Sequence, residues 1–306
     1  MEPFLIHILG CGSALPTLKH YASSQIVEVR GKMFMIDCGE GTQLQLRRYH
    51  IGFNRIQGVF ISHLHGDHCF GLIGMISTFG MLGRTAPLTI YAPAELRPLL
   101  KMQLSMFCDK LEYEVKFVAI QDTTQQRIIY EDKSITVETV PLQHRIPCCG
   151  FIFREKKGLR HIRRDMIDCY EIPLSQLNLI RQGADYTTPE GEVIRNEQLT
   201  YPADEPRSYA YCSDTRFIPT LWQNVELVTA LYHDSTYNSQ LQSRASLYYH
   251  STSAQAAQVA LKAGAKQLIL GHFSARFDDE TVLLKEAKDI FTNTVLANEG
   301  EIIRIE

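Results

Sequence analysis

Four side chains of the kinds that bind metal ions lie within six consecutive residues, in the segment His63-Leu64-His65-Gly66-Asp67-His68. An apolar run, residues 58–61, comes just before it and predicts a buried strand. Neutral imidazole and carboxylate groups suit zinc, manganese or iron, and such a site needs no thiolate. A histidine-rich loop and a single structural zinc are the simpler alternatives. A structural zinc site is usually closed with four ligands, whereas this segment alone offers four and later segments offer more.

The spacing within this segment predicts two metal positions. If the chain stays extended to His65, residues i and i+2 point to the same side, so that His63 and His65 reach one ion together. Gly66 then allows the backbone to turn sharply. Past that turn, Asp67 and His68 face a second position.

Three further candidate ligands each follow a run of residues that we expect to form an apolar strand. They are His144 after residues 134–140, Asp214 after residues 208–212, and His272 after residues 267–270. The end of a strand is a place where a rigid element can hold a site. Taken one by one, such residues are more often structural polar groups, and only together with the first segment do they indicate a metal centre.

A centre with two ions suits the hydrolysis of a phosphodiester. Two ions about 3.5–4 Å apart can clamp both the attacking and the leaving oxygen. Asp67 can orient the attacking water or take its proton. Asp37, at the end of another expected strand, is either a partner for a metal-binding imidazole or an ordinary acid in a turn.

Composition and charge indicate a globular protein without a membrane-spanning helix. The chain has 306 residues, of which 45% are hydrophobic and 21% charged, and its net charge is -3. A nucleic-acid partner would therefore need a local basic patch. No run of 18 apolar residues occurs, and the N-terminal segment lacks the basic start of a signal peptide. Eight Cys without a CxxC pair predict reduced, buried thiols in a cytoplasmic protein.

The periodicity predicts two strand-rich halves, each supplemented by helices, which is compatible with two packed sheets covered by helices on both outer faces. We expect a short helix over Gln43–His50 with Thr42 as its N-cap, and a buried strand over Leu227–Tyr232. The Gly-rich loop at residues 10–17 could cradle a phosphate or form a tight turn, and the sequence leaves both open.

Residues 154–200 are polar and rich in Gly and Pro, which predicts an inserted segment outside the core. Basic side chains crowd its beginning and are candidates for binding a nucleic acid through its phosphates. These candidates are Arg154, Lys156, Lys157, Arg160, Arg163 and Arg164.

The pattern His-x-His-x-Asp-His after a hydrophobic strand resembles the metallo-β-lactamase superfamily, which contains lactamases, thioesterases, phosphodiesterases and nucleases. The resemblance implies an α/β fold, an αββα sandwich of two mixed sheets flanked by helices. It also implies one domain over residues 1–306 with an inserted arm at 154–200. The implied cofactors are two divalent ions, in the first place Zn²⁺. The implied ligands are His63, His65 and His144 for one ion, Asp67, His68 and His272 for the other, and Asp214 as the bridge.

Three more segments resemble the ribonuclease Z family within this superfamily. They are His250-Ser251-Thr252, where the family has His-x-Thr; His233-Asp234-Ser235-Thr236, where it usually has His-Glu-Ala-Thr; and His272-Phe273-Ser274-Ala275-Arg276-Phe277, close to its His-Phe-Ser-x-Arg-Tyr. The chain departs from the family at Asp234, one methylene shorter than Glu, and at Lys19-His20-Tyr21, where Arg-Asn is usual. The arm also lacks the family's Gly-Pro pair.

This resemblance implies an endoribonuclease that removes the 3′ trailer of precursor tRNA, leaving a 3′-hydroxyl on the tRNA and a 5′-phosphate on the trailer. It further implies a homodimer. Because the leaving oxygen needs a proton, we expect His250 to act as the general acid and Asp234 to orient its imidazole. The alternatives are a small-molecule phosphodiesterase of the same superfamily and a non-catalytic RNA-binding relative.

Overall fold

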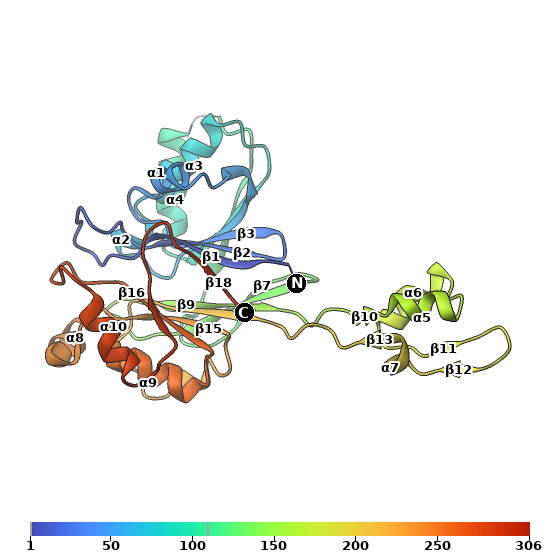
Figure 1. Ribbon diagram of the computed structural model, residues 1–306. Coiled ribbons are helices and arrows are strands. Elements are labelled where there is room, and N and C mark those ends of the chain that lie inside the picture. Colours follow the sequence, from blue (N-terminus) through green and yellow to red (C-terminus); the bar gives the residue numbers. More distant parts are fainter. Residues whose placement is uncertain (1, 109) are drawn as a thin grey trace. The chain divides into compact units, whose positions relative to one another are not determined.

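The computed structural model describes residues 2–108 and 110–306, and its largest elements are two seven-stranded mixed sheets (Figure 1). The first sheet has the order β18-β1-β2-β3-β4-β5-β6. Its strands are β1 (Phe4–Gly10), β2 (Ser24–Val29), β3 (Lys32–Ile36), β4 (Ile56–Phe60), β5 (Leu88–Pro93), β6 (Val115–Ile120) and β18 (Ile302–Arg304). Neighbours from β3 to β6 run parallel, whereas β1, β2 and β18 pair antiparallel.

The second sheet has the order β17-β16-β15-β14-β9-β8-β7. Its strands are β7 (Ile128–Glu131), β8 (Ile135–Pro141), β9 (Cys149–Glu155), β14 (Ser208–Cys212), β15 (Ala230–Asp234), β16 (Gln267–Gly271) and β17 (Thr294–Leu296). The four strands β14 to β17 run parallel, so their carboxyl ends meet at one edge.

Helices cover the outer faces of both sheets. Figure 1 shows α1 (Thr42–Arg48), α3 (Leu72–Met81) and α4 (Leu96–Phe107) outside the first sheet, and α8 (Gln242–Tyr248), α9 (Ser253–Ala263) and α10 (Thr281–Lys288) outside the second. Short helices complete the connections: α2 (Gly66–Cys69), η1 (Phe53–Arg55), η2 (Leu221–Gln223) and η3 (Ser239–Leu241). The αββα sandwich is therefore confirmed. No helix among the described residues has the length and apolar character needed to cross a bilayer.

The alternation of side chains along each strand divides the apolar residues between two cores. In β4, Val59 belongs to the core between the first sheet and its helices, whereas Phe60 belongs to the core between the two sheets. Phe60 lies 5.5 Å from Phe151 and 5.4 Å from Phe153 of the opposite sheet, measured between ring centroids. Burying one such ring contributes about 1.5–3 kcal/mol. These rings hold the two sheets together directly behind the expected metal segment.

Several element boundaries differ from the sequence-based prediction by one or a few residues, and two of these differences have a local cause. Thr42 is the first residue of α1 and not its N-cap: its hydroxyl donates to the Gly39 carbonyl, and Gly41 is the N-cap with φ +83°. The strand expected to begin at Leu227 begins at Ala230, because Leu227 has φ +53° and an exposed side chain. The strand also ends later than expected, at Asp234.

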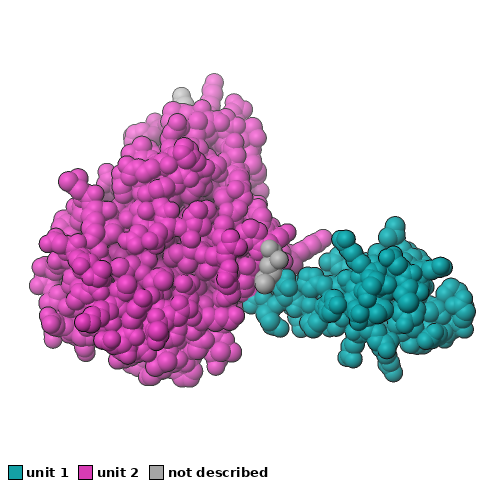
Figure 2. All heavy atoms as spheres, viewed as in Figure 1, with its two compact units in different colours: residues 1, 155–206 teal, residues 2–154, 207–306 magenta. Residues whose placement is uncertain are grey.

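Residues 155–206 form a compact unit separate from residues 2–154 and 207–306 (Figure 2). Its elements are β10 (His161–Ile162), α5 (Arg164–Cys169), α6 (Leu174–Arg181), β11 (Tyr186–Thr187), β12 (Val193–Ile194), α7 (Asn196–Leu199) and β13 (Thr200–Tyr201). Five buried side chains form its own small core: Ile172, Ile180, Tyr186, Ile194 and Leu199.

All eight cysteines are free, but the prediction that they are buried was wrong for three of them. Cys169 in α5 is exposed, and Cys69 and Cys108 are partly exposed. Each lies in or directly after a helix that has one side open to solvent, so the scattered spacing that indicated free thiols did not determine their burial.

Candidate metal centre

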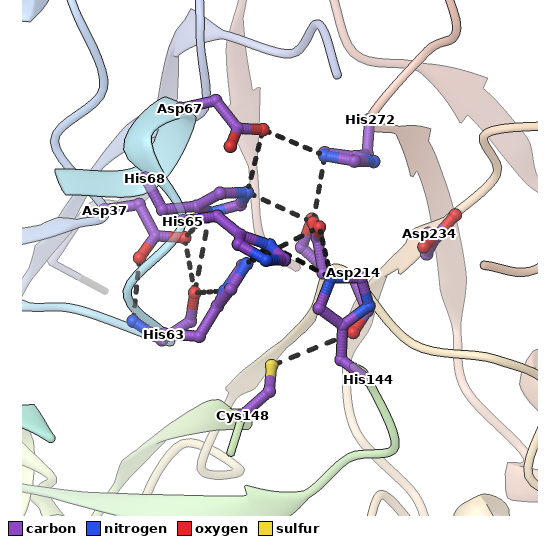
Figure 3. A network of polar contacts seen from close by, with 12 residues as sticks. Asp37, His63, His65, Asp67, His68, His144, Cys148, Asp214, Asp234 and His272 are labelled. Carbon is purple, nitrogen blue, oxygen red and sulfur yellow. Dashed lines mark hydrogen bonds and ion pairs between the residues drawn. The ribbon is translucent and has the colours of Figure 1, made fainter. Parts of the chain in front are cut away.

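The candidate ligands come from strand ends of both sheets and converge at one edge of the sandwich (Figure 3). The His63-to-His68 segment follows β4, although β4 ends at Phe60 and the two first histidines lie in a loop. His144 follows β8. Asp214 and His272 follow the parallel strands β14 and β16. Parallel strands place their carboxyl ends side by side, which explains why residues distant in sequence meet here.

The first group of ligand-type atoms belongs to His63, His65, His144 and Asp214, and all of them lie within 4.8 Å of one another. His63 Nε2 is 3.0 Å from His65 Nδ1, which is 3.1 Å from His144 Nε2. Asp214 Oδ2 lies 3.6 Å from both His63 Nε2 and His144 Nε2.

The second group belongs to Asp67, His68, His272 and the same Asp214. Asp214 Oδ1 lies 2.9 Å from His272 Nε2 and 3.1 Å from His68 Nε2. Asp67 Oδ2 lies 3.4 Å from His68 Nε2 and 3.6 Å from His272 Nε2. The carboxylate of Asp214 therefore presents one oxygen to each group.

Three atoms of the second group indicate that a cation fits there. Asp67 Oδ2, His68 Nε2 and His272 Nε2 are buried and have no hydrogen-bond partner of suitable geometry among the described residues. Buried polar atoms are normally satisfied, so such orphans need an explanation. Ligands bound tetrahedrally at about 2.0–2.1 Å lie about 3.3 Å from one another, close to the spacings found in both groups. The nitrogen and oxygen donors fit zinc, manganese or iron.

Electrostatics differ between the two groups. Burial is the main cause that lowers the pKa of His63, His65 and His144, with only partial compensation by Asp214. In the second group burial also favours the neutral form, but nearby carboxylates outweigh it. They raise the pKa of His272 to about 10, and that of His68 well above its ordinary value. The carboxylates around the second group therefore favour positive charge at this position.

Asp37 holds the second group from behind. Its Oδ2 accepts hydrogen bonds from His68 Nδ1 at 2.7 Å and from the Tyr211 hydroxyl at 2.8 Å. Its carboxylate also accepts from the Ser62 amide and hydroxyl at 2.8 and 2.9 Å. This fixes the His68 tautomer with Nε2 toward the centre. Of the two alternatives, the structure therefore favours the partner of a ligand imidazole over an ordinary turn acid.

His250 and Asp234 form a hydrogen bond of 2.8 Å between Nδ1 and Oδ2. Asp234 is fully buried, which by itself would raise its pKa, but the adjacent His250 makes the net shift a lowering. Thr215 N and Thr236 N also donate to this carboxylate, at 3.1 and 2.9 Å. The shorter Asp side chain thus reaches the imidazole.

The imidazole of His250 lies next to both groups of ligand-type atoms. Its ring centroid is 5.2 Å from that of His272 and 5.3 Å from that of His144. A cavity of about 350 Å³ is lined by Asp67, Asp214 and His250, among others. A substrate atom in this cavity would therefore be within reach of the ligand-type atoms and of a separate imidazole.

Backbone conformation supports a functional role for this edge. Asp37, Asp214 and His272 have φ values of +54°, +54° and +61°, a region that residues other than glycine seldom adopt. Strain of this kind persists where the surroundings fix it, and it clusters at functional sites.

Several contributing residues were not among the candidates named from the sequence. Ser62 bridges Asp37 and His63, and the Thr236 hydroxyl bridges Asp234 and His272. The Tyr249 carbonyl lies 3.1 Å from His144 Nδ1. Thr236 is the last residue of the quoted segment His233-Asp234-Ser235-Thr236, and Ser62 directly precedes His63, so their places in the sequence were the available signal.

The basic residues of the arm are partly engaged by neighbours. Arg154 Nε lies 3.2 Å from Glu138, Arg160 Nε donates to the Thr200 hydroxyl at 2.7 Å, and Arg163 pairs with Asp165 at 3.1 Å. Lys157 and Arg164 are exposed, and Lys156 is partly exposed. Residues 155–206 as a whole contain ten Asp or Glu against seven Lys or Arg, and five of these seven basic residues lie at the beginning of the unit.

Replacing Asp37 tests its part in the centre. Asp37→Asn cannot accept all four hydrogen bonds, so His68 loses its fixed tautomer, and we expect the affinity for a divalent ion to fall by about 10–100-fold. Competition with a chromogenic chelator measures this affinity. Glu40→Gln, which removes an exposed negative charge nearby, is the control and should change little. Equal affinities of Asp37→Asn and the wild type would show that Asp37 only stabilises the turn.

Comparisons with known proteins agree with the motifs. Residues 4–161 match the family described as Anti-Pycsar protein Apyc1. Ribonuclease Z from Bacteroides fragilis is 56% identical over 305 residues, covering 100% of both chains. Human tRNase Z, short form, has a TM-score of 0.70 at 23% identity and covers 99% of each chain. The metallo-beta-lactamase fold protein YhfI from Bacillus subtilis has a TM-score of 0.69 at 18% identity, covering 99% of this chain and 100% of its own.

The two structures share the fold, and the match over residues 4–161 includes the first sheet and the His63-to-His68 segment. The relative at 56% identity extends the similarity through His250 and His272 to the C-terminal strand. The chain is a hydrolytic nuclease of the metallo-β-lactamase superfamily and belongs to the ribonuclease Z family.

Proposed function

We propose that this chain removes the 3′ trailer from precursor tRNA by hydrolysing one phosphodiester bond with the help of two divalent ions, in the first place Zn²⁺. The observation that carries the proposal is the Asp214 carboxylate between two groups of ligand-type atoms, with the His250–Asp234 pair beside them. The family membership supports the choice of substrate.

The ions would be held by His63, His65 and His144, by Asp67, His68 and His272, and by Asp214 as the bridge. When bound, they supply an acidified water and neutralise charge on the phosphoryl oxygens. Asp67 orients the attacking water and can accept its proton. His250 donates a proton to the leaving 3′ oxygen, and Asp234 keeps the His250 ring oriented through Nδ1. The products are a tRNA with a 3′-hydroxyl and a trailer with a 5′-phosphate.

We further propose a cytoplasmic location, which eight free cysteines support because disulfides are rare in reducing compartments. The small-molecule phosphodiesterase is the weaker alternative. The chain has an inserted unit of about fifty residues, which begins with exposed basic side chains. Such a unit suits the binding of a large polyanion, whereas a small substrate does not need it.

The bridging role of Asp214 predicts a graded loss of metal. Asp214→Ala removes an oxygen from both groups, so both ions should be lost. His65→Ala removes a donor from the first group alone and should mainly weaken that ion. Turnover should disappear in both variants. Metal analysis per chain and cleavage of a precursor tRNA measure the two effects, and full activity of metal-free protein in excess chelator would refute the proposal.

Replacing His250 separates proton donation from metal binding. His250→Ala should slow cleavage of precursor tRNA by about 10²–10⁴-fold with both ions retained, because the 3′ alkoxide leaves unprotonated. Asp234→Asn should cause a smaller loss. Cleavage of bis-p-nitrophenyl phosphate, which has a good leaving group, should be slowed much less. If His250→Ala slows cleavage of both substrates by the same factor, or if the variant loses metal, His250 is not the general acid.

The exposed basic residues at the start of the arm predict salt-dependent binding of tRNA. Lys157→Gln with Arg164→Gln should weaken binding and reduce the slope of log K against log salt concentration by about 0.9 per lost phosphate contact. Arg181→Gln with Arg195→Gln is the matched control, since it removes the same charge from the acidic part of the unit. Deleting about residues 156–198 should have a larger effect and preserve hydrolysis of bis-p-nitrophenyl phosphate. Unchanged tRNA affinity after this deletion would contradict the role of the arm.

We also propose a homodimer, which an exposed apolar face of α4 supports. Leu99, Met102 and Met106 lie on successive turns and are 45%, 53% and 69% exposed. Met102→Lys with Met106→Lys should yield a monomer in sedimentation experiments. Leu261→Lys with Val282→Lys, on exposed positions of α9 and α10, should leave the dimer intact. A wild-type monomer at micromolar concentration would refute the proposal.

A further inference from the structure

A second cavity of about 540 Å³ adjoins the metal centre. Both cavities are lined by Leu15, His65, Asp67 and Arg145. The second one continues toward Phe70 and Tyr21, and its lining does not include Asp214, His272 or His250. We call this second cavity the side groove. It begins at the ligand segment and leads away from the side on which His250 stands.

Phe70 is the main exposed aromatic side chain of the side groove. It is 71% exposed, an unusual state for a phenylalanine, whereas Asp67 on the same short helix is only partly exposed. It lies at the C-cap of α2, three residues after Asp67, so both side chains project from the same face of that short helix. Phe70 and Asp67 both line the side groove.

The ring of Phe70 lies directly against the backbone of Gly66. A Cβ atom at Gly66 would lie only 2.3 Å from Phe70 Cε2, so the ring packs against the bare backbone of this residue. A side chain at this position would displace the ring from its place, which gives Gly66 a role in addition to the turn expected from the sequence. An aromatic ring that is largely exposed is suited to stacking.

The opposite wall of the side groove is also fixed. His20 Nδ1 lies 2.9 Å from Glu299 and its Nε2 lies 3.1 Å from Glu280, and these contacts tie the wall segment to two distant parts of the chain. Leu15 is 67% exposed along this wall. The side groove is therefore formed before any ligand enters.

The chemistry of the side groove matches a single nucleobase better than a run of phosphates. Exposed Phe70 and Leu15 offer apolar and aromatic surface, whereas the charged side chains in the lining, apart from the ligand Asp67 and the paired His20, are Arg145 and Glu40. Stacking on an aromatic ring tolerates any base because every base has a π face. Arg145 also lines the metal cavity and can contact a phosphate next to the base.

We propose that the side groove binds the first nucleotide of the 3′ trailer, with its base stacked on Phe70. The inference rests on the proposed function, because it uses His250 as the donor to the leaving 3′ oxygen. That oxygen belongs to the tRNA, so the tRNA end lies on the His250 side of the scissile phosphate. The other substituent of the same phosphate is the trailer, and the side groove opens on the side that His250 does not occupy.

The test compares a precursor tRNA that carries a purine at the first trailer position with the same precursor made abasic at that position. Phe70→Ala should lower kcat/KM for the purine substrate by about 5- to 150-fold, the range expected for one lost base–aromatic stack. The abasic substrate should be cleaved equally by Phe70→Ala and the wild type. Phe70→Trp should restore cleavage of the purine substrate, since it keeps an aromatic face.

Two further measurements separate stacking from a merely structural effect. Metal content and the affinity for tRNA without a trailer should not change in Phe70→Ala. Leu261→Ala, which removes an exposed apolar side chain from α9, should leave kcat/KM unchanged for both precursors. Equal losses on the purine and abasic substrates, or weaker binding of trailer-less tRNA, would overturn the inference while the proposed function stands. A wild-type protein that does not cleave precursor tRNA would refute the proposed function itself, and the inference with it.

Discussion

The centre depends on one carboxylate that two sets of imidazoles share. Asp214 comes from the second sheet, whereas the His63-to-His68 segment comes from the first, so the two sheets must be packed in one fixed arrangement for its two oxygens to meet both groups. The aromatic contacts of Phe60 with Phe151 and Phe153 supply that arrangement directly behind the site. Because protein interiors are close-packed, a shift of one sheet against the other would disrupt these contacts. The packing that stabilises the sandwich therefore also fixes the geometry of the centre.

Two further buried carboxylates extend this arrangement outward. Asp37 accepts from His68, and Asp234 accepts from His250, in each case through the ring nitrogen that points away from the centre. A buried carboxylate is costly unless donors surround it, and each of these two has at least three donor groups. The donors are backbone amides and hydroxyls in or next to the motifs. The polar network orients the imidazoles before any ligand arrives.

The sequence predicted the architecture and the convergence of the ligand-type residues because both follow from short-range patterns. Apolar runs that end in His or Asp indicate strands with functional side chains at their ends. The resemblance then assigned these His and Asp residues to two groups. Other features depend on three-dimensional contacts that no local pattern encodes. The start of β15 moved because Leu227 adopts a positive φ, and the close approach of the Phe70 ring to Gly66 exists only in the folded chain. Ser62 and Thr236 are common residue types whose bridging contacts exist only once both sheets are assembled.

Asp234 shows how the fold accommodates a shorter side chain than the family's usual Glu. β15 continues through Asp234, which pairs with Gly271 of β16, so the backbone carries the carboxylate up to the edge where His272 begins the next loop. From there a single methylene is enough to bring Oδ2 within 2.8 Å of His250. A side chain with fewer rotatable bonds loses less conformational entropy when it is fixed. Thr215, Thr236 and His250 together engage both carboxylate oxygens of Asp234. The end of the strand therefore sets the orientation of the imidazole, and a side chain as long as Glu is not required.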